Sequence, residues 1–102
     1  MPIKSTISED NKTLTIAIEG RLDVSRHKAF GDAYAGKVEN VDKVILDLVD
    51  LEYIDSSGLG MMLMLREKAI ASKAEVEIIN TSPGVLKIFK MTNYNKLFKI
   101  IE

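Results

Sequence analysis

The sequence predicts an α/β domain built on a mixed, mostly parallel β-sheet with packed helices and an antiparallel hairpin at its N-terminal end. Residues 3–8 and 13–19 are strand-like segments joined by a short polar turn, which is typical of a hairpin. Strand and helix segments then alternate along the chain, a rhythm that implies parallel pairing through right-handed crossovers. At 102 residues and 46% hydrophobic content, the chain fits one domain, residues 1–102, around a single core.

The hairpin is predicted from the alternation of apolar and polar residues. Residues 3–8 alternate weakly, as an edge strand does, and residues 9–12 are all polar and turn-forming. Residues 13–19 alternate more clearly and place three apolar side chains on one face: Leu14, Ile16 and Ile18. We expect residues 20–23 to end this second strand.

The first helix is expected to begin at a Ser25 cap and to end at Lys37. Apolar side chains recur at helical spacing in and just after this segment and predict a buried face: Phe30, Ala33, Tyr34 and Val38. His27 lies in the same helix without an acidic or serine neighbour at fixed spacing. We therefore interpret it as a surface histidine rather than a catalytic group.

A buried strand, a short acidic loop and a helix N-terminus meet in the middle of the chain. Residues 44–48 are too apolar and β-branched for a loop and too few for a helix, so they predict the strand. Residues 61–71 are rich in helix formers. Ser56 or Ser57 is expected to cap this helix, because a serine oxygen accepts a hydrogen bond from an unpaired NH group of the first turn.

The last third of the chain repeats the strand and helix rhythm. Residues 75–79 predict a strand, and a short helix follows that Ser82 caps and that ends at Met91. Residues 92–95 predict a loop, and residues 96–101 predict a last strand or an apolar tail.

Composition narrows the classes of partner. The net charge of -1 gives no general attraction to nucleic acid or to anionic lipid, and there is no cysteine for disulfide or thiol chemistry. No apolar stretch approaches the ~20 residues that span a bilayer, and residues 1–4 lack the features of a signal peptide. We expect a cytoplasmic protein that binds other proteins, with no direct contact to nucleic acid or membrane.

The serines at the helix start have two interpretations. In the first, they cap the helix while Gly58 and Gly60 relieve crowding. In the second, Ser56 or Ser57 is a switch, because a helix N-terminus presents free NH groups and a partial positive charge that favour a phosphate group. The same physics allows a small anion or a nucleotide to bind there, although the glycines lack the Lys and Ser/Thr of a phosphate-binding loop.

The residues flanking the serines also leave alternatives open. Four carboxylates form either a solvated loop or a docking site for basic residues of a kinase, and their spacing matches no metal-ligand pattern: Asp47, Asp50, Glu52 and Asp55. Three methionines either fill the core or leave one or two exposed as an adaptable docking surface: Met61, Met62 and Met64. No nucleophile, base and orienting group occur at usable spacing, so we expect neither an enzyme nor a cofactor.

The motif Asp-Ser-Ser-Gly-Leu-Gly at residues 55–60 resembles the phosphorylation site of STAS domains, in particular the small bacterial anti-sigma factor antagonists of partner-switching systems. The likeness covers nearly the whole chain. It includes a Gly-x-Leu-Asp turn, a central strand with its approach loop, and two closing segments: residues 20–23, 44–48, 53–55, 82–83 and 97–100.

The resemblance implies a regulator of signal transduction and transcription. The unphosphorylated protein is expected to bind an anti-sigma factor or a related serine kinase, phosphorylation is expected to end that association, and a PP2C-type phosphatase is expected to restore it. Ser56 aligns with the phosphoacceptor. The resemblance also implies a loop that surrounds the phosphorylation site and binds the partner: Asp23, Asp55, Ser57, Gly58, Leu59, Gly60 and Met61.

Asp23 and Arg21 bear on the expected partner-binding role of this loop. Asp23 lies at a strand-to-helix turn and can equally cap the helix. Arg21 stands between Gly20 and Leu22, where an acidic residue is common in the family. Since some relatives act on signalling proteins other than sigma-factor regulators, a partner of that other kind is the alternative.

Overall fold

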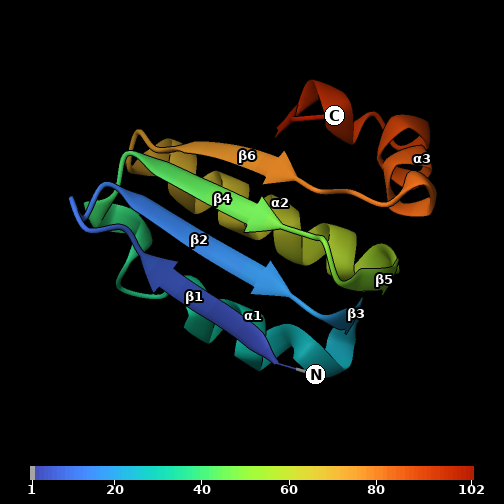
Figure 1. Ribbon diagram of the computed structural model, residues 1–102, viewed down its shortest axis with the longest axis horizontal. Helices are drawn as coiled ribbons and strands as arrows, with labels where there is room; N and C mark the ends of the chain where they lie inside the picture. The colour runs from blue at the N-terminus through green and yellow to red at the C-terminus, as the bar shows by residue number, and fades with distance from the viewer. Residues whose placement is uncertain (1) are drawn as a thin grey trace.

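The main sheet has five strands in the order β1-β2-β4-β6-β7, and helices α1 (His27–Tyr34) and α2 (Ser56–Ala71) lie behind it (Figure 1). The computed structural model describes residues 2–102; Met1, which we counted within the domain, lies outside this range. β1 (Ile3–Ile7) pairs with β2 (Thr13–Ile18) in antiparallel fashion, whereas the three other pairs in this sheet are parallel. The predicted fold class is therefore confirmed.

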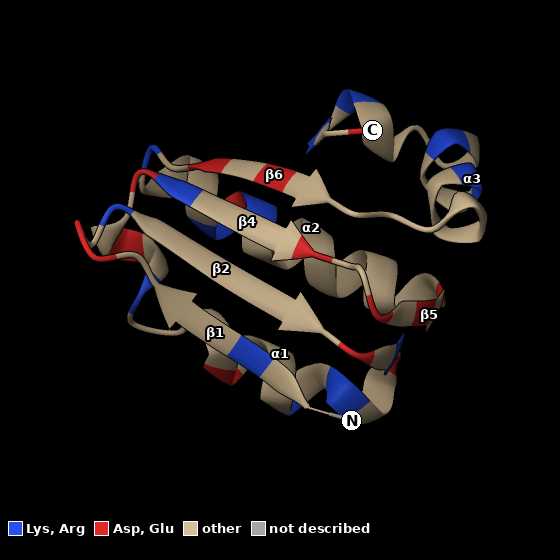
Figure 2. Cartoon of the chain, in the orientation of Figure 1, with Lys and Arg blue, Asp and Glu red and all other residues tan. Residues whose placement is uncertain are grey.

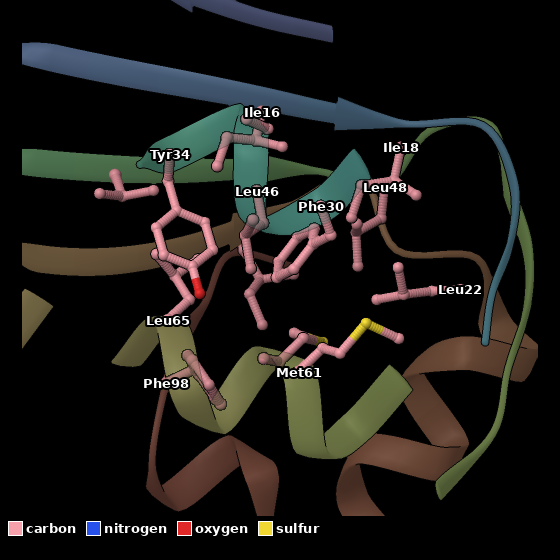
Figure 3. Close-up of a cluster of buried hydrophobic side chains, with 14 of the residues drawn as sticks. Ile16, Ile18, Leu22, Phe30, Tyr34, Leu46, Leu48, Met61, Leu65 and Phe98 are labelled. Carbon is pink, nitrogen blue, oxygen red and sulfur yellow. The ribbon is translucent and has the colours of Figure 1, made fainter. Parts of the chain in front are cut away.

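The inner face of the sheet is built by rows of aligned apolar residues. β4 (Lys43–Asp47) lies between β2 and β6 (Glu75–Ile79), and β7 (Lys99–Ile100) pairs with the outer side of β6. The register aligns Ile16 with Leu46, and Leu46 with Ile78, all of which are fully buried. Figure 3 shows Ile16 and Leu46 facing side chains from α1 and α2. The opposite face carries polar groups, among them Glu77, whose carboxylate lies 3.0 Å from Lys43 Nζ.

A second, two-stranded sheet was not predicted. β3 (Gly20–Leu22) pairs in parallel with β5 (Leu51–Ile54), so residues 20–23 do not simply end β2, and residues 53–54 belong to a strand rather than to a loop. Gly20 causes the change of direction: its φ of 79° belongs to the left-handed region that favours glycine, and its NH group donates to the Asp50 carbonyl at 2.9 Å. The chain thereby leaves the main sheet and pairs with β5.

The first helix is shorter than predicted. A 3-10 turn (Val24–Arg26) precedes α1 (His27–Tyr34). The residue that caps this turn is Asp23 rather than Ser25, because Asp23 Oδ1 accepts a hydrogen bond from the Ser25 NH group at 3.0 Å. The helix ends at Tyr34 instead of Lys37, since Gly36 adopts a φ of 74° that helices do not use. A further 3-10 turn (Val38–Asn40) then leads to β4.

The helices after β5 follow the prediction more closely. α2 spans Ser56–Ala71, and α3 spans Pro83–Met91 with the expected Ser82 cap, whose hydroxyl accepts from the Val85 NH group at 3.2 Å. No helix within residues 2–102 is long and apolar enough to cross a membrane. The C-terminal segment differs from the prediction in two respects. A 3-10 turn (Tyr94–Lys96), whose Tyr94 ring is buried, begins in the predicted loop at 92–95, and the strand expected within 96–101 is limited to β7 (Lys99–Ile100).

Candidate functional site

The start of α2 is capped by Asp55. Asp55 has an extended backbone, its Oδ1 atom accepts from the Gly58 NH group at 3.0 Å, and its carbonyl accepts from the Leu59 NH group at 2.9 Å. The prediction that Ser56 or Ser57 caps the helix was therefore wrong. The chain becomes helical directly after Asp55, and aspartate is as good a cap as serine.

Ser56 and Ser57 are the first two residues of α2, and both are exposed. The first NH groups of a helix have no carbonyl partner within that helix and carry the positive end of its dipole. A hydroxyl at this position is open to a modifying enzyme, and a phosphate group attached to it would lie next to those NH groups. The site can therefore accept a phosphate without disturbing the core.

Gly58 fixes the start of α2 against β3. A Cβ atom at this position would lie 2.7 Å from Cγ1 of Ile54 and would also overlap the carbonyl oxygen of Leu22. The Asp55 NH group donates to the same Leu22 carbonyl at 3.4 Å. By contrast, a Cβ atom at Gly60 would meet nothing within 4 Å. Gly58 is thus the glycine that lets the helix start approach the neighbouring strand.

Arg21 and Tyr53 lie side by side next to this helix start. The β3–β5 register aligns the two residues, and the Arg21 guanidinium lies 5.2 Å from the centre of the Tyr53 ring. Arg21 Nε also lies 3.2 Å from Asp23 Oδ2. Hydrogen bonds from the Ser25 hydroxyl and the Ser25 NH group to Asp23 lower the pKa of this carboxyl, and the charge of Arg21 acts in the same direction. Asp23 therefore both caps the turn before α1 and orients Arg21.

The expected partner-binding residues differ in exposure. Gly58 and Met61 are buried, whereas the others are exposed or half-buried: Asp23, Asp55, Ser57, Leu59 and Gly60. Met62 is fully buried as well, and Met64 is 50% exposed. Two of the three methionines thus fill the core and one remains at the surface. His27 is exposed, as expected, and with Met64 it borders a small 40 Å³ hollow between α1 and α2.

The four carboxylates before the serines do not act as one group, although acidic residues gather around β5 (Figure 2). Asp55 caps α2, and Asp47 Oδ1 accepts from the Val49 NH group at 3.2 Å and from Asn80 Nδ2 at 3.1 Å. Asp50 and Glu52 line an open cleft of about 680 Å³ together with Glu19. Within residues 2–102, no three or more histidine, cysteine or acidic side chains are placed to hold a metal ion.

The sequence did not predict a contact between the C-terminal segment and α2. The Tyr94 hydroxyl donates to the Leu59 carbonyl at 2.9 Å, and the Tyr94 ring stacks on Phe89 and Phe98 with centroid distances of 6.0 and 5.7 Å. Burial raises the pKa of this hydroxyl, which keeps it protonated as a donor. The apolar spacing of residues 89, 94 and 98 was a signal for this cluster, but its partner on α2 is 35 residues away in the chain.

Comparison with known proteins identifies the family of this chain. Residues 5–102 match the family model described as "Mlab, STAS domain". The chain is 41% identical over 100 residues to a STAS-domain containing protein of Pseudomonas aeruginosa (strain UCBPP-PA14), an alignment that covers 98% of this chain and 99% of that protein.

Solved structures of an anti-sigma factor antagonist, SpoIIAA, share the fold. The unphosphorylated form aligns with a TM-score of 0.72 at 22% identity, covering 87% of this chain and 82% of that one. The phosphorylated form from Bacillus aligns with a TM-score of 0.75 at 20% identity, covering 98% and 91%. The family match, the curated relative and the strand order agree, and this chain belongs to the STAS domain family.

Proposed function

We propose that this STAS domain is a phosphorylation-controlled regulator of the anti-sigma factor antagonist type, which binds a protein partner when Ser56 is unphosphorylated and releases it when Ser56 is phosphorylated. The observation that carries the proposal is the exposed Ser56 hydroxyl at the first position of α2, where the close approach of Gly58 holds the helix start against β3. A protein with the same fold, SpoIIAA, has been solved in unphosphorylated and phosphorylated forms.

The partner in this proposal is an anti-sigma factor or a related serine kinase, and a PP2C-type phosphatase resets the switch in the cytoplasm. The surface around Ser56 suits a protein partner, because the flat Tyr53 ring is 48% exposed and is held in place by Arg21. Aromatic and arginine side chains of this kind contribute much of the binding energy in protein interfaces. A signalling partner unrelated to sigma-factor control would use the same surface.

Phosphorylation would switch binding through charge. A phosphate group adds about -1.5 to -2 charge at pH 7, and it would lie in an already acidic region that contains Asp55 and Glu52. A free anion or nucleotide is a weaker candidate for this place. The Asp55 carboxylate already accepts from the Gly58 NH group and repels any further negative group, and a free anion has no covalent bond that holds it at this place.

The test is the mass and phosphopeptide map of the protein purified from its native host, before and after treatment with a PP2C-type phosphatase. We expect one removable phosphate on Ser56, absent from Ser56→Ala and present in Ser57→Ala. Ser57→Ala is the matched control, because both serines are exposed at the same helix start. Phosphate that persists in Ser56→Ala and disappears in Ser57→Ala would move the site to Ser57, and a protein that is never phosphorylated would refute the proposal.

A further inference from the structure

The outer edge of β1 is a free strand edge. β1 is the terminal strand of the main sheet, and within residues 2–102 no other strand pairs with its outer side. Figure 1 shows it at the margin of the sheet, in front of α1. Strand edges of this kind readily pair with another strand, because their backbone NH and carbonyl groups have no partner in the sheet.

The hydrogen bonds to β2 determine which backbone groups point outward. The Glu19 NH group donates to the Pro2 carbonyl at 3.3 Å, and the Ser8 NH group donates to the Thr13 carbonyl at 2.9 Å. In an antiparallel pair only every second residue bonds to a given neighbour. The even-numbered residues of β1 therefore face β2. The odd-numbered residues direct their NH and carbonyl groups away from it: Ile3, Ser5 and Ile7.

We infer that this edge pairs with the same edge of a second copy of the chain, antiparallel about a two-fold axis at Ser5, so that two five-stranded sheets become one. In this register Ser5 bonds to Ser5 of the second copy, and Ile3 bonds to Ile7. Every outward donor then meets an outward acceptor. A shift by one residue would oppose outward-facing and inward-facing groups, and a shift by two residues would pair fewer of them.

The side chains suit a second copy as well. Ile3 is packed against the core and Ile7 is 37% exposed, so each Ile3–Ile7 pair would cover apolar surface at both ends of the junction. Lys4, the one charged residue of β1, would face Thr6 of the second copy, so no like charges oppose each other. The Lys37 ammonium group donates to Ser5 Oγ at 2.8 Å from the helix side, which leaves the Ser5 backbone edge uncovered by this contact.

The pairing goes beyond the proposed function and does not depend on it. The Ser56 site lies at the junction of β5 and α2, in a part of the fold that does not pair with β1. A dimer through β1 would therefore carry two Ser56 sites and would bind a bivalent partner with higher avidity than a monomer does. Because only five residues per chain pair, we expect a dimer that dissociates on dilution rather than a permanent one.

The test is sedimentation equilibrium of the full chain over a concentration series, with paired substitutions at exposed Thr6. Thr6→Glu would create two Lys4–Glu pairs across the junction, whereas Thr6→Lys would oppose lysines. From typical cross-strand pair energies we expect the dissociation constant to fall about two- to thirtyfold in Thr6→Glu and to rise by a similar factor in Thr6→Lys. Thr6 faces uncharged Thr15 on β2, so neither change creates a charge conflict with its opposite residue in the protomer.

A second pair of variants tests the backbone. Ser5→Pro removes an outward NH group but no bond to β2, and we expect it to abolish the dimer, whereas Ser5→Ala keeps the NH group and the dimer. If Ser5→Pro fails to fold, the Thr6 pair carries the test. A chain that stays monomeric in all variants would overturn the inference, and so would a dimer that responds equally to Thr6→Glu and Thr6→Lys.

Discussion

Gly58 lies so close to the backbone carbonyl of Leu22 that no side chain fits between them. This contact joins the start of α2 to β3, two segments that are separated in the chain by α1, β4 and β5. The Asp55 NH group donates to the same carbonyl, so the helix start that carries Ser56 is held at the residues on both sides of the two serines. The position of the candidate phosphorylation site thus depends on a strand that contributes nothing to the main sheet.

Gly58→Ala should destabilise the domain, and Gly60→Ala should not. The added methyl group at Gly58 meets the Leu22 backbone, which cannot rotate away, so we expect a loss of about 1–3 kcal/mol in the free energy of unfolding. Gly60 has open space, and alanine there should add about 0.5–1 kcal/mol through its helix propensity. Urea unfolding of both variants measures the difference. Equal stability of the two variants would contradict the close approach of Gly58.

Asp55→Ala should lower stability by about 1 kcal/mol, because the Gly58 NH group loses its acceptor. Asp55→Asn keeps an oxygen at the same position and should retain most of the stability, since asparagine caps helices as well as aspartate does. Thermal melts of both variants check this expectation. A loss in Asp55→Asn as large as in Asp55→Ala would mean that the charge of Asp55, rather than its hydrogen bond, stabilises α2.

Asp23 should make the stability dependent on pH in the acid range. Its pKa is lowered in the folded state, chiefly by the Ser25 hydroxyl, so its stabilising effect is complete above the unfolded pKa and is lost as pH falls through the folded pKa. The stability difference between the native protein and Asp23→Asn should therefore shrink below roughly pH 4. NMR titration of the Asp23 carboxyl should show a higher pKa in Ser25→Ala, and an unchanged pKa there would contradict the assigned cause.

Phosphorylation of Ser56 should weaken partner binding without unfolding the domain. Leaving a charge buried and unpaired in the complex costs roughly 3 to 5 kcal/mol, which is at least about a hundredfold in affinity. In the free protein the dipole of α2 offsets the repulsion from Asp55, so the melting temperature should change little. Ser56→Ala should bind constitutively, and Ser56→Asp should bind weakly.

Calorimetric titration with the partner, together with melting curves of both forms, checks this last prediction. Ser57→Ala serves as the control and should respond to phosphorylation as the native protein does. Equal affinity of the two forms for the partner, or a large fall in melting temperature on phosphorylation, would contradict the switch.

Local sequence pattern was sufficient for most of the main sheet. Alternation of apolar residues located β2, and the apolar run at residues 44–48 located β4, because each strand buries one face against the helices. The start of α2 was found for the same kind of reason, since strand residues stop and helix formers begin there. The motif at residues 55–60 then identified the STAS family, to which the chain belongs.

Contacts between distant segments account for most of what the pattern missed, whereas the cap of α2 is a local difference. Asp55, rather than a serine, caps α2 because the chain leaves β5 in an extended conformation up to that residue. The pairing of β3 with β5 brought Arg21 onto the Tyr53 ring and Leu22 against Gly58. The apolar pattern of a strand of three or four residues does not predict which strand it pairs with, so the shape of the surface around Ser56 is decided by tertiary packing. The serine itself and its place at a helix start can be predicted from the sequence alone.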